Sequence, residues 1–109
     1  MLVTLKEVLD LAQKGNFAIP AFNVYNMETT MGVIQAAEEA KAPVIIQVYA
    51  RLFQSGNAYY LAPSILAAAK QASVPVCFHL DHATDLELIK QAAAAGFSSV
   101  MYDGSTLPF

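Results

Sequence analysis

Apolar and polar positions in the first part of the chain alternate between helical and strand spacing. Residues Thr4–Glu7 have the form of a capping box, and the apolar residues that follow recur on one helical face until Gly15 ends the predicted helix. A short apolar run at 17–22 predicts a strand. Asn26 can cap a second helix with one apolar face, which Pro43 ends.

The middle of the chain predicts a strand, a loop and a long helix. Residues 44–48 are mostly β-branched, which is typical of a strand buried on both faces. Residues 51–60 contain a Ser-Gly-Asn turn sequence and are predicted to form a loop. Pro63 suits the first turn of a third helix, which runs to about Ala72.

The last part repeats the alternation. Residues 76–80 predict a strand, Thr84–Glu87 a second capping box with a helix that reaches Gly96, and residues 97–102 a final strand. The pattern is one helix followed by four strands that alternate with three helices. Such alternation predicts an α/β fold with right-handed crossovers and a parallel sheet.

Four parallel strands are half of a (β/α)8 barrel, which takes about 250 residues. A small open four-stranded sheet is the alternative, and the alternation alone does not choose between them. No linker divides residues 1–109, so we expect a single domain.

Composition narrows the classes of function. Hydrophobic residues make up 56% of the 109, and charged residues only 14%, which excludes disorder and indicates a large interface or a missing remainder. No apolar run reaches the ~18 residues that span a bilayer, so no membrane is expected. The net charge of −3 without a basic stripe argues against nucleic acid. The single Cys77 and the absence of a signal-peptide pattern predict a cytoplasmic location.

The segment His79-Leu-Asp-His82 is the strongest candidate for chemistry. Because side chains alternate along a strand, His79 and Asp81 share a face, and His82 follows at the C-terminal end, where parallel α/β proteins place their sites. A structural cluster, in which Asp81 holds a histidine or caps the next helix, is the alternative. Zinc needs three protein ligands, and this chain has only two histidines.

Residues 74–83 resemble the zinc-aldolase signature, an apolar strand that ends in His-x-Asp-His and a small residue. Segments 19–23, 42–45 and 96–105 occur in the order and spacing of the same family, so the resemblance covers nearly the whole chain. The family is the class II ketose-bisphosphate aldolases, which includes fructose-1,6-bisphosphate and tagatose-1,6-bisphosphate aldolases. The resemblance implies the N-terminal half of a (β/α)8 barrel.

The resemblance also implies roles for single residues. Asp81 matches the catalytic acid/base that handles the proton of the C4 hydroxyl, and His82 the first ligand of the catalytic Zn²⁺. Asp103 matches a carboxylate for a second metal ion or a monovalent cation, and a turn residue is its alternative. Asn23 matches an active-site asparagine, with local turn bonding as its alternative. His79 either supports His82 or packs in the core.

The implied reaction is cleavage of a ketose 1,6-bisphosphate to dihydroxyacetone phosphate and an aldehyde. The expected substrate is fructose 1,6-bisphosphate, for which the aldehyde is glyceraldehyde 3-phosphate. Zinc would stabilise the enediolate as a Lewis acid. The family implies a place in glycolysis or related carbohydrate metabolism and a full-length parent that is a homodimer or homotetramer.

Two departures from the family pattern matter. Tyr49 stands where the family usually has a Ser or Thr that contacts the distal phosphate, and Arg51 can supply an anion contact instead; a packed loop is the alternative. Family members also continue beyond the length of this chain, and their other zinc ligands and their phosphate loop lie there. We therefore expect residues 1–109 to be inactive alone, and the rival interpretation is a non-catalytic half-barrel module for assembly.

Overall fold

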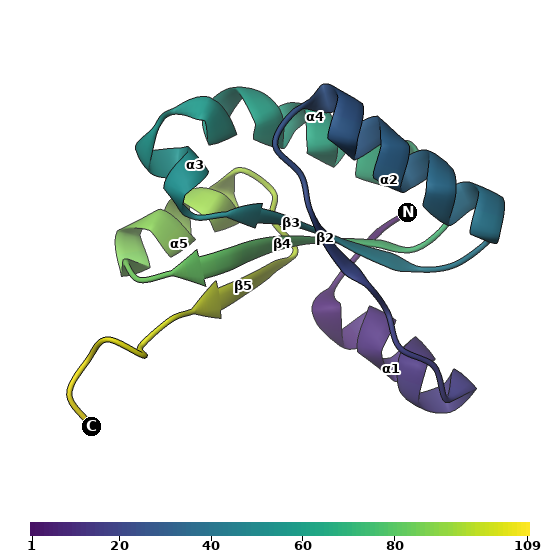
Figure 1. Cartoon of the computed structure of the whole chain (residues 1–109), viewed down its shortest axis with the longest axis horizontal. Helices are drawn as coiled ribbons and strands as arrows, with labels where there is room; N and C mark the ends of the chain where they lie inside the picture. The colour runs from purple at the N-terminus through teal and green to yellow at the C-terminus, as the bar shows by residue number, and fades with distance from the viewer.

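The computed structural model describes residues 1–109 as a layer of parallel strands with helices on one side and a single helix on the other (Figure 1). No helix in it is both long and apolar enough to cross a membrane. In chain order the elements are β1 (Leu2–Val3), α1 (Leu5–Gly15), β2 (Ala21–Asn23), α2 (Met27–Ala40), β3 (Val44–Tyr49), α3 (Arg51–Gln54), α4 (Asn57–Gln71), β4 (Val76–Ala83), α5 (Leu86–Ala94) and β5 (Ser99–Tyr102).

Strands β2, β3, β4 and β5 lie side by side in the order of the chain, all parallel. Right-handed crossovers between sequential neighbours put every connecting helix on the same face. A doubly wound sheet would reverse its order at a switch point and carry helices on both faces. The order observed here is the one found in one half of a (β/α)8 barrel, as the sequence predicts.

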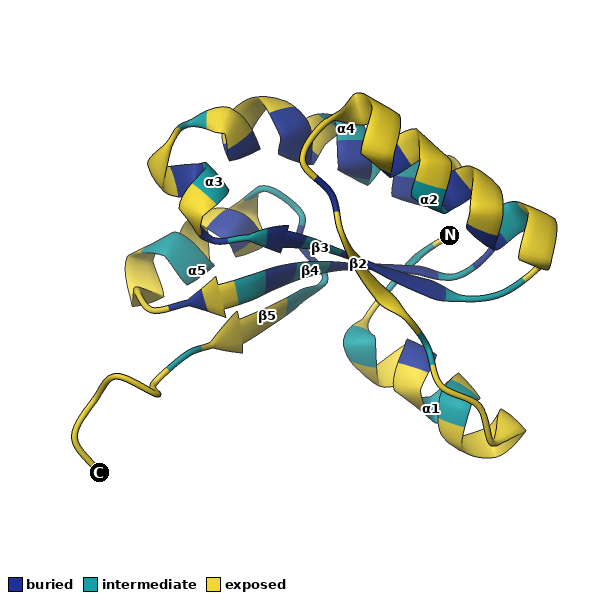
Figure 2. Ribbon diagram, viewed as in Figure 1, coloured by how far each residue is buried: buried dark blue, intermediate teal, exposed yellow.

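The main core lies between the sheet and helices α2 to α5. Alternate residues of the two central strands point into it, and they are almost completely buried (Figure 2). The four-residue helix α3 contributes Phe53, and Phe97 after α5 stacks on Phe78 with ring centroids 3.8 Å apart. The strand residues of this core are Val44, Ile46, Val48, Val76, Phe78, Leu80 and Ala83.

Helix α1 covers only part of the opposite face. Its Val8 packs with Ile45 of β3 and Cys77 of β4 in a small second cluster. Thr4 and Glu7 form the predicted capping box, and Asn26 caps α2 as predicted. The C-terminal ends of the strands on this face have no helix over them (Figure 1).

Three local predictions are wrong. Residues 51–60 are not a loop but contain α3 and the start of α4, since Gly56 adopts φ of +82° and turns the chain within a few residues. Pro63 consequently lies inside α4 rather than in its first turn. Asp85, not Thr84, caps α5, by accepting a hydrogen bond from the Glu87 N–H at 2.8 Å.

A short strand escaped prediction. Strand β1 has two residues, too few to show a periodic pattern, and it pairs with Val76 and Cys77 of β4. The Met1 ammonium group donates to the Val74 carbonyl oxygen at 2.8 Å, which fixes the start of the strand. Strand β4 is therefore bordered by β1 at its first residues and by β5 further along.

Candidate functional site

Polar side chains form a row across the uncovered face of the sheet. The strand register places Asn23 beside Gln47, Gln47 beside His79, and His79 beside Ser99. Neighbouring residues in register share a face, so one residue from each of four strands contributes to this row. One step further along the strands, Tyr49 lies beside Asp81. The carboxyl ends of the strands thus gather polar groups that are far apart in the sequence.

The Gln47 side chain joins the row to Asp81. Its Nε2 donates to Asn23 Oδ1 at 2.7 Å and to Asp81 Oδ2 at 3.3 Å. The Asp81 side chain is 16% exposed, so one carboxylate oxygen is held and the group still reaches solvent. Sequence reasoning missed Gln47, although a lone amide inside a β-branched run was a usable signal.

A bulge re-aims His82. The four residues of β4 from Leu80 to Ala83 span the same length as the three residues of β5 from Val100 to Tyr102, and His82 adopts φ of +53°. In a regular strand, Asp81 and His82 would point to opposite faces. Here His82 Nε2 lies 3.8 Å from Asp81 Oδ1, so both side chains serve the same site. A left-handed conformation is uncommon for residues other than glycine and costs free energy, which the surrounding contacts offset.

Asp103 holds the other nitrogen of His82. Its backbone N–H donates to the Ala83 carbonyl oxygen at 2.8 Å, and its Oδ2 lies 2.9 Å from His82 Nδ1. The hydrogen bond to Asp103, helped by the charge of Asp81, raises the pKa of His82 above its ordinary value. The bonds to His82 and to Ser105 lower the pKa of Asp103 well below its usual range.

The His79 side chain forms a hydrogen bond with Ser99 and not with His82. Its Nδ1 lies 2.7 Å from Ser99 Oγ, and burial lowers the pKa of its imidazole. The histidine is thus satisfied within the sheet and makes no hydrogen bond to His82, which favours the packed interpretation over support of the neighbouring histidine.

The structure brings four of the five sequence-predicted site residues into one contact network. Asn23 connects to Asp81 through Gln47, Asp81 lies against His82, and His82 bonds Asp103. The fifth, Tyr49, presents its ring edge-on to the His82 ring, with centroids 6.1 Å apart.

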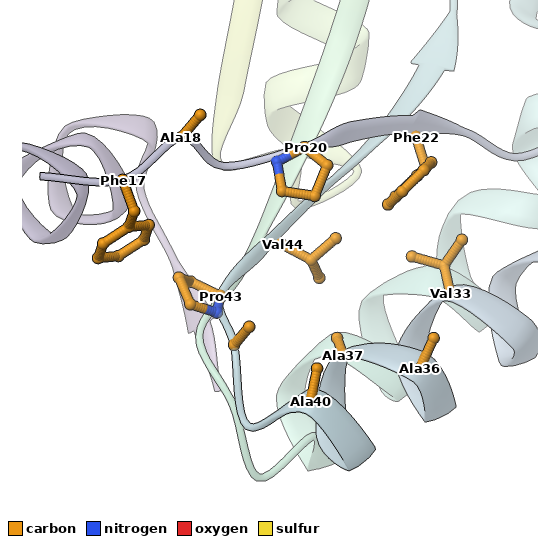
Figure 3. Close-up of a pocket in the computed structure, with 11 residues that line it drawn as sticks. Phe17, Ala18, Pro20, Phe22, Val33, Ala36, Ala37, Ala40, Pro43 and Val44 are labelled. Carbon is orange, nitrogen blue, oxygen red and sulfur yellow. The ribbon is translucent and has the colours of Figure 1, made fainter. Parts of the chain in front are cut away.

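A cavity of about 430 Å³ opens beside this network. Its wall includes Tyr49, Arg51, His82, Asp85 and Asp103. A second cavity of about 190 Å³ lies on the helical side, between the β2 segment and α2, where the side chains of Phe17, Pro20, Phe22 and Val33 converge (Figure 3). That cavity has no titratable side chain in its wall, so the chemistry belongs to the first.

The chain does not hold a complete metal site. No group of three His, Cys, Asp or Glu side chains lies close enough to bind an ion. With Nδ1 engaged by Asp103, His82 can offer Nε2 to a metal, and a carboxylate behind a ligating imidazole is the usual support for zinc. The residues therefore fit one corner of a zinc site, and zinc requires three protein ligands.

Comparison with known proteins identifies the family. The family model described as fructose-bisphosphate aldolase class-II matches residues 3–109. The chain belongs to the class II fructose-bisphosphate aldolase family. Fructose-bisphosphate aldolases from Giardia intestinalis and Treponema pallidum are each 41% identical to it over 99% of its length.

Structural comparison agrees with this family. The crystal structure of the YdjI aldolase from Escherichia coli K12 matches with a TM-score of 0.92 and 37% identity, over 99% of this chain and 42% of that one. The chain spans 34% of the length of the two aldolases from Giardia and Treponema. It therefore corresponds to part of a class II aldolase, and its fold to half of the barrel.

Proposed function

We propose that this chain is the N-terminal part of an aldolase that cleaves a ketose 1,6-bisphosphate, with fructose 1,6-bisphosphate as the default, to dihydroxyacetone phosphate and an aldehyde. One observation carries the proposal: the Asp81 carboxylate, held by Gln47 on the uncovered face, lies against His82, whose far nitrogen is held by Asp103. A proton acceptor next to a positioned imidazole suits a carbon–carbon cleavage that must move one proton and stabilise one negative charge.

Asp81 acts as the general acid/base. In cleavage its carboxylate accepts the proton of the C4 hydroxyl, the C3–C4 bond breaks, and the electron pair passes to the three-carbon phosphate half. In condensation the same proton returns. Gln47 acts as a positioning residue, because its Nε2 binds Oδ2 and leaves Oδ1 directed toward His82 and the substrate.

His82 would supply one ligand nitrogen, Nε2, to the catalytic zinc, which would need two further protein ligands. Zinc, when bound, acts as a Lewis acid toward the oxygens of the three-carbon half. Asp103 holds His82 in the required orientation, and we keep it as the carboxylate for a second metal ion or monovalent cation.

Asn23 and Tyr49 contact the substrate. The Oδ1 of Asn23 accepts from Gln47, so its Nδ2 remains available to donate to a substrate oxygen. The Tyr49 ring stands on the cavity wall beside His82.

The test separates the two adjacent residues in the full-length protein. His82→Ala is expected to lose both bound zinc and cleavage, whereas Asp81→Ala keeps its zinc and loses turnover, because only the imidazole ligates. Zinc content by atomic absorption and bisphosphate cleavage rate are the measurements, and Asp10→Asn, an exposed carboxylate on α1, is the control. Equal loss of zinc in the two site variants would contradict the assignment.

A further inference from the structure

Arg51 is the one charged residue on the wall of the 430 Å³ cavity whose side chain has no hydrogen-bond or ion-pair partner. Asp85 is engaged, since its carboxylate accepts from the Glu87 N–H at the start of α5. His82 and Asp103 are engaged with each other at 2.9 Å. The guanidinium of Arg51 carries a permanent positive charge and five N–H donors, all of which remain available.

The Tyr49 ring contacts both the Arg51 guanidinium and the His82 ring. The Arg51 Cζ atom lies 5.8 Å from the centroid of the Tyr49 ring, and the same ring meets the His82 ring edge-on at 6.1 Å. The ring is thus flanked by the cation and the imidazole. A cation over an aromatic face is attracted by the ring, which reduces the number of positions that the long arginine side chain samples.

We propose that Arg51, positioned by Tyr49, binds the terminal anionic group of the aldehyde half of the substrate, a phosphate or a carboxylate. This inference rests on the proposed function, which places the reacting carbons near Asp81 and His82. A substrate that reaches from there into the cavity presents its far end to Arg51, the free cation of that wall. The guanidinium fork matches both oxyanions through paired hydrogen bonds.

The inference predicts selectivity rather than general activity. In the full-length protein, Arg51→Gln is expected to lower kcat/KM about ten- to a hundredfold for condensation of dihydroxyacetone phosphate with an aldehyde that ends in phosphate or carboxylate. With a neutral aldehyde of equal length the change should stay within about twofold. Arg51→Lys should recover part of the loss, because it restores the charge but not the fork. The anion with the larger loss is the one that the site recognises.

Two further measurements keep the outcomes apart. Dihydroxyacetone phosphate exchanges a proton of its hydroxymethyl carbon, which becomes C3 of the ketose, with solvent. This exchange needs no aldehyde, so Arg51→Gln should leave its rate unchanged. Lys70→Gln, an exposed cation on α4, is the matched control and should change no rate. An equal loss with neutral and anionic aldehydes, or no loss with either, would overturn the assignment of Arg51.

Failure of the proposed function gives a different result, in which the parent protein shows neither exchange nor cleavage. Arg51 is then tested by calorimetric titration of the parent and of Arg51→Gln with inorganic phosphate and with acetate. At least tenfold weaker binding of one anion by the variant supports the anion site, and equal binding overturns it.

Discussion

The face of the sheet opposite helices α2 to α5 has two halves, one covered by α1 and one uncovered, and the same strands run through both. Toward the N-terminal ends, Ile45 and Cys77 lie side by side under Val8 of α1 and are buried. Two residues further along the same strands, Gln47 and His79 lie side by side and form part of the polar row. The strand pairing is the same in both halves, but the residues under α1 are apolar and those beyond it are polar. A covered layer stabilises the fold, whereas an uncovered one is available for chemistry.

The largest effect is expected when residues 1–109 are studied alone, with nothing to cover the exposed half of the sheet. We expect isolated residues 1–109 to self-associate or remain molten, because β2 and β5 expose unpaired edges and side chains such as Phe22 and Tyr102 are about half exposed. Each 100 Å² of wet apolar surface forfeits about 2.5 kcal/mol, against a typical domain stability of about 5–15 kcal/mol.

Sedimentation with a zinc titration measures this outcome. We expect zinc binding no tighter than that of a single histidine site, since no three ligands come together. A cooperative melt of a monomer would contradict the expectation and would support an independent open sheet.

In the covered half, Ile45→Ala is expected to cost about 2–5 kcal/mol of unfolding free energy in the full-length protein, because it leaves a cavity under α1. Denaturant unfolding measures the loss. Met31→Ala on α2, where the side chain is half exposed, is the control and should cost far less. A loss no greater than that of the control would show that α1 does not seal this layer.

In the uncovered half, Gln47→Leu should lower activity and leave stability nearly unchanged. We expect kcat to fall about ten- to a hundredfold because Asp81 loses the donor that orients it, while the unfolding free energy changes by less than about 1 kcal/mol. Steady-state kinetics and denaturant unfolding of the full-length protein separate the two quantities. Gln35→Leu, an exposed amide on α2, is the control, and unchanged kcat would remove Gln47 from the site.

The smallest effect concerns a carboxylate on the helical side that acts on stability only. Glu38 of α2 accepts from the Ser73 N–H at 2.8 Å and from its hydroxyl at 3.1 Å, which lowers the pKa of Glu38 below 4.5. Because the folded pKa is lowered, the stabilisation is present above pH 4.5 and is lost as the pH falls through the folded value.

Glu38→Gln is therefore expected to lower the melting temperature slightly at pH 7 and less at pH 3. Thermal melts of the full-length protein at the two pH values measure this difference. Glu39→Gln, whose side chain makes no hydrogen bond, should show no such pH dependence. A gap between wild type and Glu38→Gln that widens on acidification would contradict the sign.

Much of the fold follows from local patterns in the sequence. The alternation of helical and strand spacing, the caps at Thr4 and Asn26 and the buried runs of β3 and β4 depend on residues close together in the chain, and the structure confirms them. The errors at residues 51–60 and at Pro63 also have a local cause. The turn residues there predicted a loop, but the turn at Gly56 is so short that helices occupy most of the segment on both sides of it.

The candidate site depended on more than the pattern. The order of residues 79–82 indicated Asp81 and His82, but strand periodicity alone would have put them on opposite faces. The bulge that reverses this arises from the pairing of β4 with β5, and the contacts of Gln47 with Asp81 and of Asp103 with His82 join residues 34 and 21 positions apart.

The sequence by itself determined most of the strands and helices and which residue types stand at the strand ends. Only the tertiary structure decided that α1 covers part of the face opposite the other helices, that a bulge turns His82 toward Asp81, and that Arg51 on the cavity wall has no ion-pair partner. The physical reason is range. Periodicity and caps act within a few residues, whereas strand register, cover and charge pairing are settled only when distant segments meet.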